Sequence, residues 1–503
     1  MEKSVSGILQ GKVTPPPSKS QAHRLLICAA LGTEPCTIAC SSVNDDIMAT
    51  MRCLNALGAS ITYSQGVFAV APVTVAKGAT LDCGESGSTL RFLMSVAAVL
   101  GADATFTGCG KLPQRPMGDL CNVLSEHGIS FERHSADELP VSCKGALKGG
   151  RFTLPGNISS QYLTGLLFAL PLADEDSEIE VTGNMTSASY IAMTLDALRI
   201  AGIDIEQKGN IFKIKGGQHY RMPSSVTVEG DWSSAAFWVV AGVTGKNPIT
   251  LCGMNNSSLQ GDSKVIDHLR LMGAFIDVRE NDIVAMPSQL FGAELDCTDT
   301  PDLLPILCVA AAVAQGTTVF TGVGRLRFKE SDRLEAMRQV LASFGVASQV
   351  GEDTFTVFGG EPVASGVVNS FGDHRIAMSA AIMSCVAKGI TKIDNSACVA
   401  KSYPSFFEDF AMLCDVSHGP ETMSLVSLYK FSKVASNYGY SSEIFSQALI
   451  NRFSFPLILL ICFILAGILA WNSRIFVNDS FKFSWLLLFL LMTMKHTFYT
   501  SFW

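Results

Sequence analysis

The chain has few charged residues and no pattern of residues typical of a bound metal. Charged side chains make up 16% of its 503 residues, hydrophobic ones 48%, and the mean hydropathy is +0.31. This balance is apolar for a soluble enzyme, so we expect one segment to skew the average. The fifteen cysteines include no CxxC pair, and there is no HExxH and no Cys/His cluster. We therefore expect no metal site and interpret the cysteines as reduced, mostly buried small side chains.

The N-terminus also lacks an apolar stretch of signal-peptide length. The first residues read MEKSVSGILQGKV. Their composition predicts a cytoplasmic protein in a reducing compartment. The net charge of −8 argues against bulk binding of nucleic acid, although it does not exclude a local basic cleft.

A repeat of about 70 residues is the most regular feature that is present. Five segments each combine an amphipathic helix, a glycine and a β-rich stretch with a turn, and by subtraction the glycines are 70, 74, 71 and 72 residues apart. These glycines are Gly58, Gly128, Gly202, Gly273 and Gly345, and a sixth step ends near Gly419. Glycine directly after a helix is typical of a left-handed cap, and the alternating stretches that follow are typical of hairpins. The repeat predicts two α/β domains of three units each, with an appendage.

Four other helices are expected to open on small polar residues. They begin with SKSQ at 18, SGST at 86, SSQY at 159 and SSAA at 233, and each is apolar on almost every side. We expect them to be buried, with their N-termini at one shared surface. Free N–H groups and the positive end of the dipole make such a surface suitable for anions. Serine is also a common N-cap, so one helix alone would not favour this interpretation, but four do.

Two segments are expected to carry the chain between the domains. Prolines in 15–18 cannot continue a helix or a central strand, and Glu229-Gly230-Asp231 precedes the last of the four helices. The predicted domains are therefore 17–229 and, together, 1–16 with 230–415.

The segment PPPSKSQAHRLL holds the densest group of candidate functional residues. Lys19, Ser20 and Arg24 lie on the first turns of a helix that we expect to be buried. The segment around Gly7 does not form a Walker loop, because only three residues separate it from Gly11 and Val13 replaces the Ser or Thr. The pattern indicates a different kind of phosphate site.

Ten motifs, in order, resemble the 5-enolpyruvylshikimate-3-phosphate (EPSP) synthase family over about residues 1–415. They are SKSQAHR (18–24), GESGSTLR (84–91), LPQRPMGDL (112–120), SSQYLTGLL (159–167), SASYIAMT (187–194), EGDWSSAA (229–236), TPDLLP (300–305), RFKESDRL (327–334), GDHRIAM (372–378) and CVAKSYPSFF (398–407). The resemblance implies a two-domain inside-out α/β barrel, each domain made of three βαβαββ units with sheets outside and helices inside. It implies an enolpyruvyl transferase of the shikimate pathway of aromatic amino-acid biosynthesis, with no cofactor.

In that family the enolpyruvyl group of phosphoenolpyruvate moves to the 5-hydroxyl of shikimate 3-phosphate, and phosphate leaves. Both substrates are small, multiply charged anions, so many cations are needed in one cleft. By resemblance, the residues that bind phosphoenolpyruvate are Lys19, Gly87, Arg115, Gln161, Arg333, Arg375 and Lys401. Those that bind shikimate 3-phosphate are Lys19, Ser20, Arg24, Ser159, Ser160, Gln161, Ser187, Tyr190, Asp302 and Lys329.

The resemblance also implies the catalytic residues. Asp302 matches the carboxylate that contacts the attacking hydroxyl, and Glu330 matches the one near the methylene carbon. Lys19 and Glu330 both remain candidates for the proton donor, and His374 is expected to orient neighbouring groups. Two carboxylates among many cations should stay ionised unless ligand closure desolvates them.

Two positions depart from the better-known family pattern. Glu85-Ser86-Gly87-Ser88 replaces Asn-Ala-Gly-Thr, which places a carboxylate beside the donor site. Arg325 replaces an asparagine that in some members touches the acceptor, so it is left out of the predicted site.

A tail at 420–503 lies beyond the resemblance. Its segment 455–471 is uncharged over 17 residues, about 25 Å as a helix, which is at the short edge of what spans a bilayer. Three interpretations remain open: a membrane anchor, a hydrophobic element that packs on the enzyme, and a read-through or fused gene model. We slightly favour the last, because nothing in the chemistry needs a membrane.

Two other functions remain open as alternatives. A UDP-N-acetylglucosamine enolpyruvyl transferase would share the fold and would use a cysteine before an Arg-Pro, but Cys109 precedes Arg115 by six residues rather than five. A membrane-tethered binding protein without catalysis is the second alternative. The expected partners are the two small substrates, with no nucleic acid, and we expect a monomer.

Overall fold

The computed structural model describes residues 2–5, 7–156, 160–183, 185, 187–280, 282–362, 366–387, 389–416, 429, 446–450 and 452. The chain divides into a larger unit, Met1–Gly7 with Thr14–Phe406, and a smaller one, Ile8–Val13 with Phe407–Trp503. In the smaller unit the backbone N–H of Gln10, beside β2 (Gly11–Val13), donates to the carbonyl oxygen of Leu413 in α12 (Phe406–Val416) at 3.2 Å. The predicted hydrophobic segment 455–471 lies outside the described residues.

The repeating glycines end helices as the sequence predicts. Each directly follows the last turn of a helix and has a φ between +73° and +105°. The helices are α2 (Asp45–Ala56), α4 (Gly118–Glu126), α6 (Ala188–Ile200), α8 (Val265–Leu271) and α10 (Arg333–Ser343). After Gly58, for example, the N–H of Ala59 donates back to the carbonyl oxygen of Leu54 at 3.0 Å, which closes the helix end. The sixth expected glycine, near 419, lies outside the described residues.

An antiparallel hairpin follows each of these five glycines, which confirms the second half of the repeat. The hairpins are β4 (Ser60–Ser64) with β5 (Val67–Ala71), β8 (Ile129–Arg133) with β9 (Val141–Gly145), β12 (Ile205–Lys208) with β13 (Ile211–Ile214), β16 (Phe275–Val278) with β17 (Asp282–Met286), and β20 (Ala347–Val350) with β21 (Thr354–Phe358).

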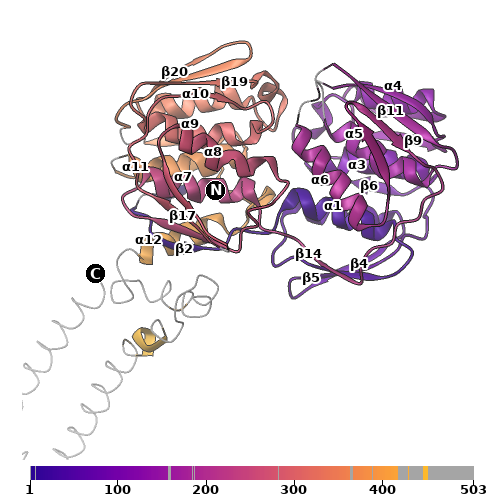
Figure 1. Cartoon of the computed structure of the whole chain (residues 1–503), viewed down its shortest axis with the longest axis horizontal. Helices are drawn as coiled ribbons and strands as arrows, with labels where there is room; N and C mark the ends of the chain where they lie inside the picture. Colours follow the sequence, from indigo (N-terminus) through magenta and orange to yellow (C-terminus); the bar gives the residue numbers. More distant parts are fainter. Residues whose placement is uncertain are drawn as a thin grey trace, which may run out of the picture. The chain divides into compact units, whose positions relative to one another are not determined.

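The βαβαββ unit is complete in three stretches of chain (Figure 1). A parallel pair of strands, joined by a buried helix, precedes the second helix and the hairpin. The parallel pairs and their helices are β6 (Thr80–Asp82), α3 (Gly87–Val99) and β7 (Thr105–Thr107); β10 (Gly150–Pro155), α5 (Ser160–Ala169) and β11 (Ser177–Thr182); and β18 (Glu294–Asp296), α9 (Leu304–Val313) and β19 (Thr317–Thr321). The sheet orders are β6-β7-β9-β8, β10-β11-β13-β12 and β18-β19-β21-β20.

The remaining strands of the larger unit extend this pattern. Strand β14 (Ser225–Thr227) pairs in parallel with β3 (Cys36–Ala39), which gives the order β14-β3-β5-β4. Strand β15 (Ile249–Cys252) pairs antiparallel with β17. Strand β23 (Thr391–Asp394) lies between β22 (Val367–Asn369) and β1 (Lys3–Val5). The predicted α/β architecture of sheets and helices is confirmed.

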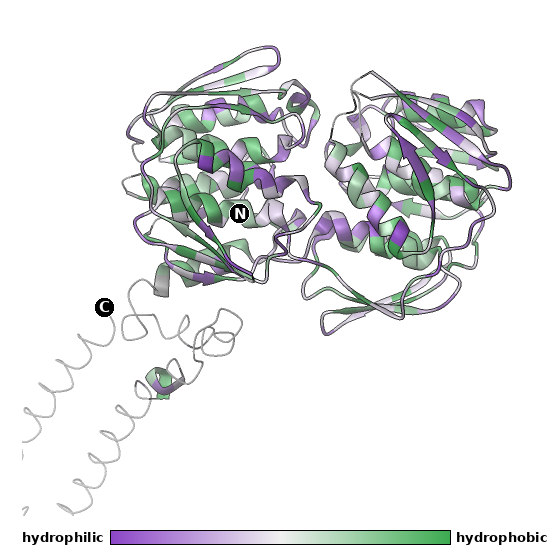
Figure 2. Ribbon diagram, in the orientation of Figure 1, coloured by the Kyte–Doolittle hydropathy of each residue, from purple (hydrophilic) through white to green (hydrophobic). Residues whose placement is uncertain are grey.

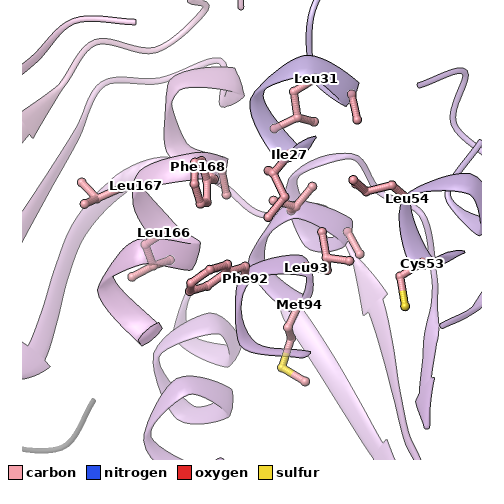
Figure 3. Close-up of a cluster of buried hydrophobic side chains, with 14 of the residues drawn as sticks. Ile27, Leu31, Cys53, Leu54, Phe92, Leu93, Met94, Leu166, Leu167 and Phe168 are labelled. Atoms are coloured by element: carbon pink, nitrogen blue, oxygen red, sulfur yellow. The ribbon is translucent and has the colours of Figure 1, made fainter. Parts of the chain in front are cut away.

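The helices are inside, as their hydrophobic patterns predict, and the sheets are outside, as the family resemblance implies. Along α1 (Lys19–Ala30), α3 and α5 nearly every residue is buried, whereas strands such as β4 alternate between buried and exposed residues. The buried helices carry mainly hydrophobic residues (Figure 2). Ile27, Phe92 and Phe168 from these three helices meet in one core, where the rings of Phe92 and Phe168 lie edge to face at 5.8 Å (Figure 3). Burial of this apolar surface stabilises the larger unit.

The two segments expected to cross between domains pair with each other. Pro17 and Gly230 form an antiparallel bridge, and Ser18 N–H donates to the carbonyl oxygen of Glu229 at 2.7 Å. The division into 17–229 and 1–16 with 230–415 stays a prediction.

Two further expectations concern the cysteines and the membrane. The fourteen cysteines among the described residues are free thiols, most of them buried, as predicted. No helix formed by the described residues has both the length and the hydrophobicity to cross a membrane.

Candidate active site

A cavity of about 560 Å³ opens at the N-termini of the four helices that start on small polar residues. Helices α1, α3, α5 and α7 (Trp232–Thr244) each present their first residues to it. Three of the starts are capped by side chains: Ser18, Ser86 and Asp231 accept from a backbone N–H of the first turn. The cavity therefore has the positive ends of several helices in its wall.

Nearly all of the predicted site residues line this cavity. They are Lys19, Ser20, Arg24, Gly87, Arg115, Ser160, Gln161, Ser187, Tyr190, Asp302, Lys329, Glu330, Arg333, His374 and Arg375. Lys401 is not part of the lining, but its Nζ lies 3.8 Å from Oε1 of Glu330. Ser159 lies outside the described residues.

Arg333, in the cavity wall, holds three carboxylates. Its side chain is 2% exposed, and its nitrogens lie 2.7 Å from Asp302 Oδ1, 2.8 Å from Glu330 Oε2 and 2.8 Å from Asp373 Oδ2. Asp373 also caps α11 (His374–Val386) by accepting from the N–H of Arg375 at 2.9 Å. One arginine thus fixes the two predicted catalytic carboxylates relative to each other.

Asp302 is surrounded by donors from several elements. Lys329 Nζ is 3.5 Å and Arg375 Nη2 is 3.4 Å from its carboxylate, and the hydroxyl of Tyr190 donates to it at 3.2 Å. Burial acts to raise the pKa of Asp302, but Arg375, Lys329 and Arg333 outweigh it and hold that pKa well below its ordinary value. The carboxylate is therefore ionised and a weak base in this state.

The pKa of Glu330 is shifted in the same direction. Burial again acts to raise it, while Arg333, Arg115 and Lys401 lower it well below the ordinary value. Glu330 is therefore also ionised here, so donating a proton requires that these cations first be neutralised by a ligand.

Arg24 is a buried cation with no carboxylate partner among the described residues. Its side chain donates to the carbonyl oxygens of Ser20 at 2.6 Å and Tyr190 at 2.9 Å, and to the hydroxyl of Thr194 at 3.0 Å. Burial lowers its pKa to about 10, so it remains charged at neutral pH. An uncompensated positive charge at a cavity wall favours an anion there.

A second cluster of arginines lies at the start of α3. Arg91 donates to Oε1 of Gln161 at 2.5 Å, and Gln161 donates in turn to Ser88 at 3.0 Å. A Cβ on Gly87 would lie 2.6 Å from Nη1 of Arg115, so only glycine lets that guanidinium keep its place against the helix start. Neither arginine has an ion pair with a carboxylate among the residues that the structure describes.

His374 is buried with both ring nitrogens unbonded in the described part of the chain. Burial, with the charges of Lys19 and Arg375, holds its pKa well below the ordinary value. The ring is therefore neutral, with one nitrogen able to donate and the other to accept.

Three charged residues of this site, Asp46, Asp231 and Asp373, could not be picked out from the sequence. Asp46 accepts from Lys19 Nζ at 2.9 Å, and Asp231 accepts from the N–H of Lys19 at 3.1 Å. Asp373, which binds Arg333, completes this set. The only signal of these residues was an acidic side chain near a helix start, and that pattern does not say which partner it meets in the fold. Arg91, in contrast, stands out in the sequence as an arginine in an apolar helix, a pattern that favours a functional role.

Arg325, which the sequence analysis left out of the site, lines the cavity. It lies in the short helix η5 (Gly324–Phe328) and donates to the carbonyl oxygen of Thr298. Burial lowers its pKa, but an arginine remains charged at neutral pH, so the cavity wall carries one more cation than the sequence predicts.

Cys109, the residue relevant to the UDP-N-acetylglucosamine alternative, does not line the cavity. It is exposed, and partial burial of its sulfur together with Glu85 raises the pKa of the thiol. A thiol with a raised pKa is a poor nucleophile and a poor acid at neutral pH.

Comparisons with known proteins agree with this geometry. The family described as EPSP synthase (3-phosphoshikimate 1-carboxyvinyltransferase) matches residues 4–410. The chain is 41% identical to the 3-phosphoshikimate 1-carboxyvinyltransferase of Clostridium acetobutylicum over 411 residues, which cover 80% of this chain and 95% of the relative. The enzyme of the same name from Clostridium kluyveri is 40% identical over 408 residues, with the same coverage.

Solved structures give the same result for the fold. The EPSP synthase of Acinetobacter baumannii superposes with a TM-score of 0.71 at 27% identity, covering 82% of this chain and 98% of that one. An enolpyruvyl transferase of Streptomyces tendae, at 18% identity and a TM-score of 0.68, shares the fold. On this evidence the chain belongs to the EPSP synthase family, the 3-phosphoshikimate 1-carboxyvinyltransferases.

Proposed function

We propose that the cavity transfers the enolpyruvyl group of phosphoenolpyruvate to the 5-hydroxyl of shikimate 3-phosphate. The observation that carries this proposal is the pairing of two kinds of group in one cavity. Arginines without carboxylate partners among the described residues lie on α1 and α3, and two ionised carboxylates, Asp302 and Glu330, line the same cavity. Such a site can hold two anions and still supply acid–base chemistry.

The acceptor is proposed to lie against the starts of α1, α5 and α6. Arg24 supplies the charge for a carboxylate, and the hydroxyls of Ser20, Ser160 and Ser187 complement a phosphate without adding charge. Gln161, Tyr190 and Lys329 complete this set. Ser159 is retained as part of it.

The donor is proposed to lie at the start of α3. Arg115 and Lys19 would contact it directly, with Gly87 allowing close approach. Arg375, Gln161 and Lys401 belong to this set as well, and so does Arg333, whose nitrogens bind the carboxylates of Asp302, Glu330 and Asp373.

In the proposed reaction the oxygen of the 5-hydroxyl bonds to C2 of phosphoenolpyruvate while Asp302 accepts the proton of that hydroxyl. Glu330 or Lys19 delivers a proton to C3, which gives a tetrahedral intermediate. Loss of phosphate from C2 and of a proton from C3 restores the double bond. The cations that depress the pKa of Asp302 would be neutralised by the bound anions, so its basicity should rise only when both substrates are present.

A phosphate-release assay tests this proposal. The purified chain with phosphoenolpyruvate should release phosphate when shikimate 3-phosphate is added, and not when UDP-N-acetylglucosamine is added. Turnover with the nucleotide sugar alone would reverse the assignment, and binding of both proposed substrates without any reaction would favour a non-catalytic protein.

We further propose that the protein acts in the cytoplasm as a monomer, on small molecules and without a cofactor or nucleic acid. The two-domain division at 16–17 and 229–230 belongs to the same proposal. Light scattering of the purified chain checks the monomer, since a mass near 53.8 kDa is expected and twice that mass would contradict it.

A further inference from the structure

Glu85 and Lys401 form an ion pair beside the proposed donor site. Oε2 of Glu85, in the turn between β6 and α3, lies 3.0 Å from Nζ of Lys401, at the end of η6 (Ser396–Lys401). The Lys401 side chain is 9% exposed, whereas that of Glu85 is 42% exposed. The lysine is therefore fixed in the protein, while its partner has access to water.

The backbone opposite Glu85 is shaped to receive its carboxylate. Gly110 has a φ of +60°, and a Cβ built on it would lie 1.9 Å from Oε1 of Glu85 and 2.4 Å from its Cδ. Any side chain at 110 would therefore occupy the place of this carboxylate. The glycine thus leaves room for the carboxylate of Glu85 next to Lys401.

Lys401 also faces Glu330, at 3.8 Å, but that carboxylate is bonded more closely to Arg333. Burial acts to lower the pKa of Lys401, and Glu330, Asp46 and Glu85 together raise it above its ordinary value. Lys401 is thus charged, and Glu85 is its closest counterion.

Lys19 provides a useful contrast. Its carboxylate partner Asp46, at 2.9 Å, has a side chain only 9% exposed and cannot move into solvent without opening the structure. Glu85 can turn away from Lys401 by rotation of an exposed side chain. Of these two lysine–carboxylate pairs, only that of Lys401 has a partner that an incoming anion can displace.

We propose that Glu85 is a displaceable counterion of Lys401 that lowers the affinity for the phosphorylated donor. An anionic group of the donor must compete with the Glu85 carboxylate for the ammonium of Lys401. The two negative charges also repel each other when both lie beside that ammonium. The inference rests on the proposed function, because it assumes that phosphoenolpyruvate lies beside Lys401. Glu85 is therefore a specificity-determining residue that does not take part in the chemical steps.

The variant Glu85→Gln tests this proposal. It keeps the size of the side chain and removes its charge, so KM for phosphoenolpyruvate should fall by about 2- to 5-fold, the range expected for a partly exposed charge pair. The kcat and KM for shikimate 3-phosphate should stay unchanged. Glu180→Gln is the matched control. Glu180 pairs with Arg151 at 2.8 Å and its side chain is 38% exposed, much like that of Glu85, and it does not line the cavity.

Two outcomes would overturn the proposal. One is an unchanged or raised donor KM in Glu85→Gln when the wild type turns over normally. The other concerns the dissociation constant for phosphoenolpyruvate, measured by equilibrium dialysis in the Lys401→Met background. There we expect Glu85→Gln to have no effect. If Glu85→Gln still tightened binding in that background, Glu85 would not act through Lys401. A wild-type protein that never reacts would instead contradict the proposed function.

Discussion

Replacing Asp302 by Asn removes one negative charge from the cavity and keeps the shape of the side chain. The amide oxygen can still accept from Tyr190, which is 3.2 Å away in the wild type. It can no longer accept the proton of the attacking hydroxyl. Loss of a general base typically lowers the rate by about 10²- to 10⁴-fold, so we expect kcat to fall within that range.

The same variant should lose some stability, because three cations lose their shared partner. Arg333, Arg375 and Lys329 lie within 3.5 Å of the Asp302 carboxylate. Removing one partner of a buried charged hydrogen bond costs about 1–3 kcal/mol, although Glu330 and Asp373 still compensate Arg333. The free energy of unfolding, measured with urea, should fall by about that amount.

Phosphate release measures the loss of turnover in this variant, and calorimetry measures whether it still binds the acceptor. Binding of shikimate 3-phosphate by Asp302→Asn should persist, since the acceptor is an anion and the cavity has become more positive. Asp299→Asn is the control, because Asp299 forms an exposed pair with Lys264 at 3.4 Å near the same segment. A folded Asp302→Asn protein whose kcat stays within about tenfold of the wild type would refute the assignment of Asp302 as the base.

Three further predictions concern the donor, the acceptor and pH. Gly87→Ala should displace the Arg115 guanidinium, 2.6 Å from the new Cβ, and raise KM for phosphoenolpyruvate by about 10- to 100-fold, with KM for shikimate 3-phosphate unchanged in the same assay. Arg24→Lys keeps the charge but loses the fork that bonds three oxygens, so KM for shikimate 3-phosphate should rise by about 10- to 100-fold; an unchanged value would remove Arg24 from the site. Burial lowers the pKa of His374 below 6.5, so the unfolded chain binds a proton there that the folded chain does not, and the free energy of unfolding should fall as the pH drops below about 6.5. His374→Gln should reduce this pH dependence in urea titrations, while His23 and His268, whose pKa values burial also lowers, maintain the rest. An identical slope would contradict the neutral buried ring.

Much of the fold could be predicted from the sequence because its strongest signals are local. A glycine such as Gly58 is required where the backbone turns left-handed after a helix, and the hairpin that follows is encoded by alternation over a few residues. The helices that begin at Lys19 and Gly87 were predicted from their polar starts and apolar bodies. These patterns need no knowledge of distant contacts.

The networks of the site could not be predicted in this way, because their partners are far apart in the chain. Glu85 and Lys401 are separated by 316 residues, and Lys19 and Asp231 by 212. Nothing in the sequence of either segment specifies such a pair. Arg325 shows the opposite case, because it departs from the family pattern and the fold nevertheless places it in the cavity wall.

A crystal structure of the Asp302→Asn variant with both substrates would test the central claim most directly. We expect phosphoenolpyruvate and shikimate 3-phosphate together in the one cavity, with the donor against Arg115 and the acceptor against Arg24. Either substrate bound elsewhere on the protein, or the two excluding each other from the cavity, would contradict it.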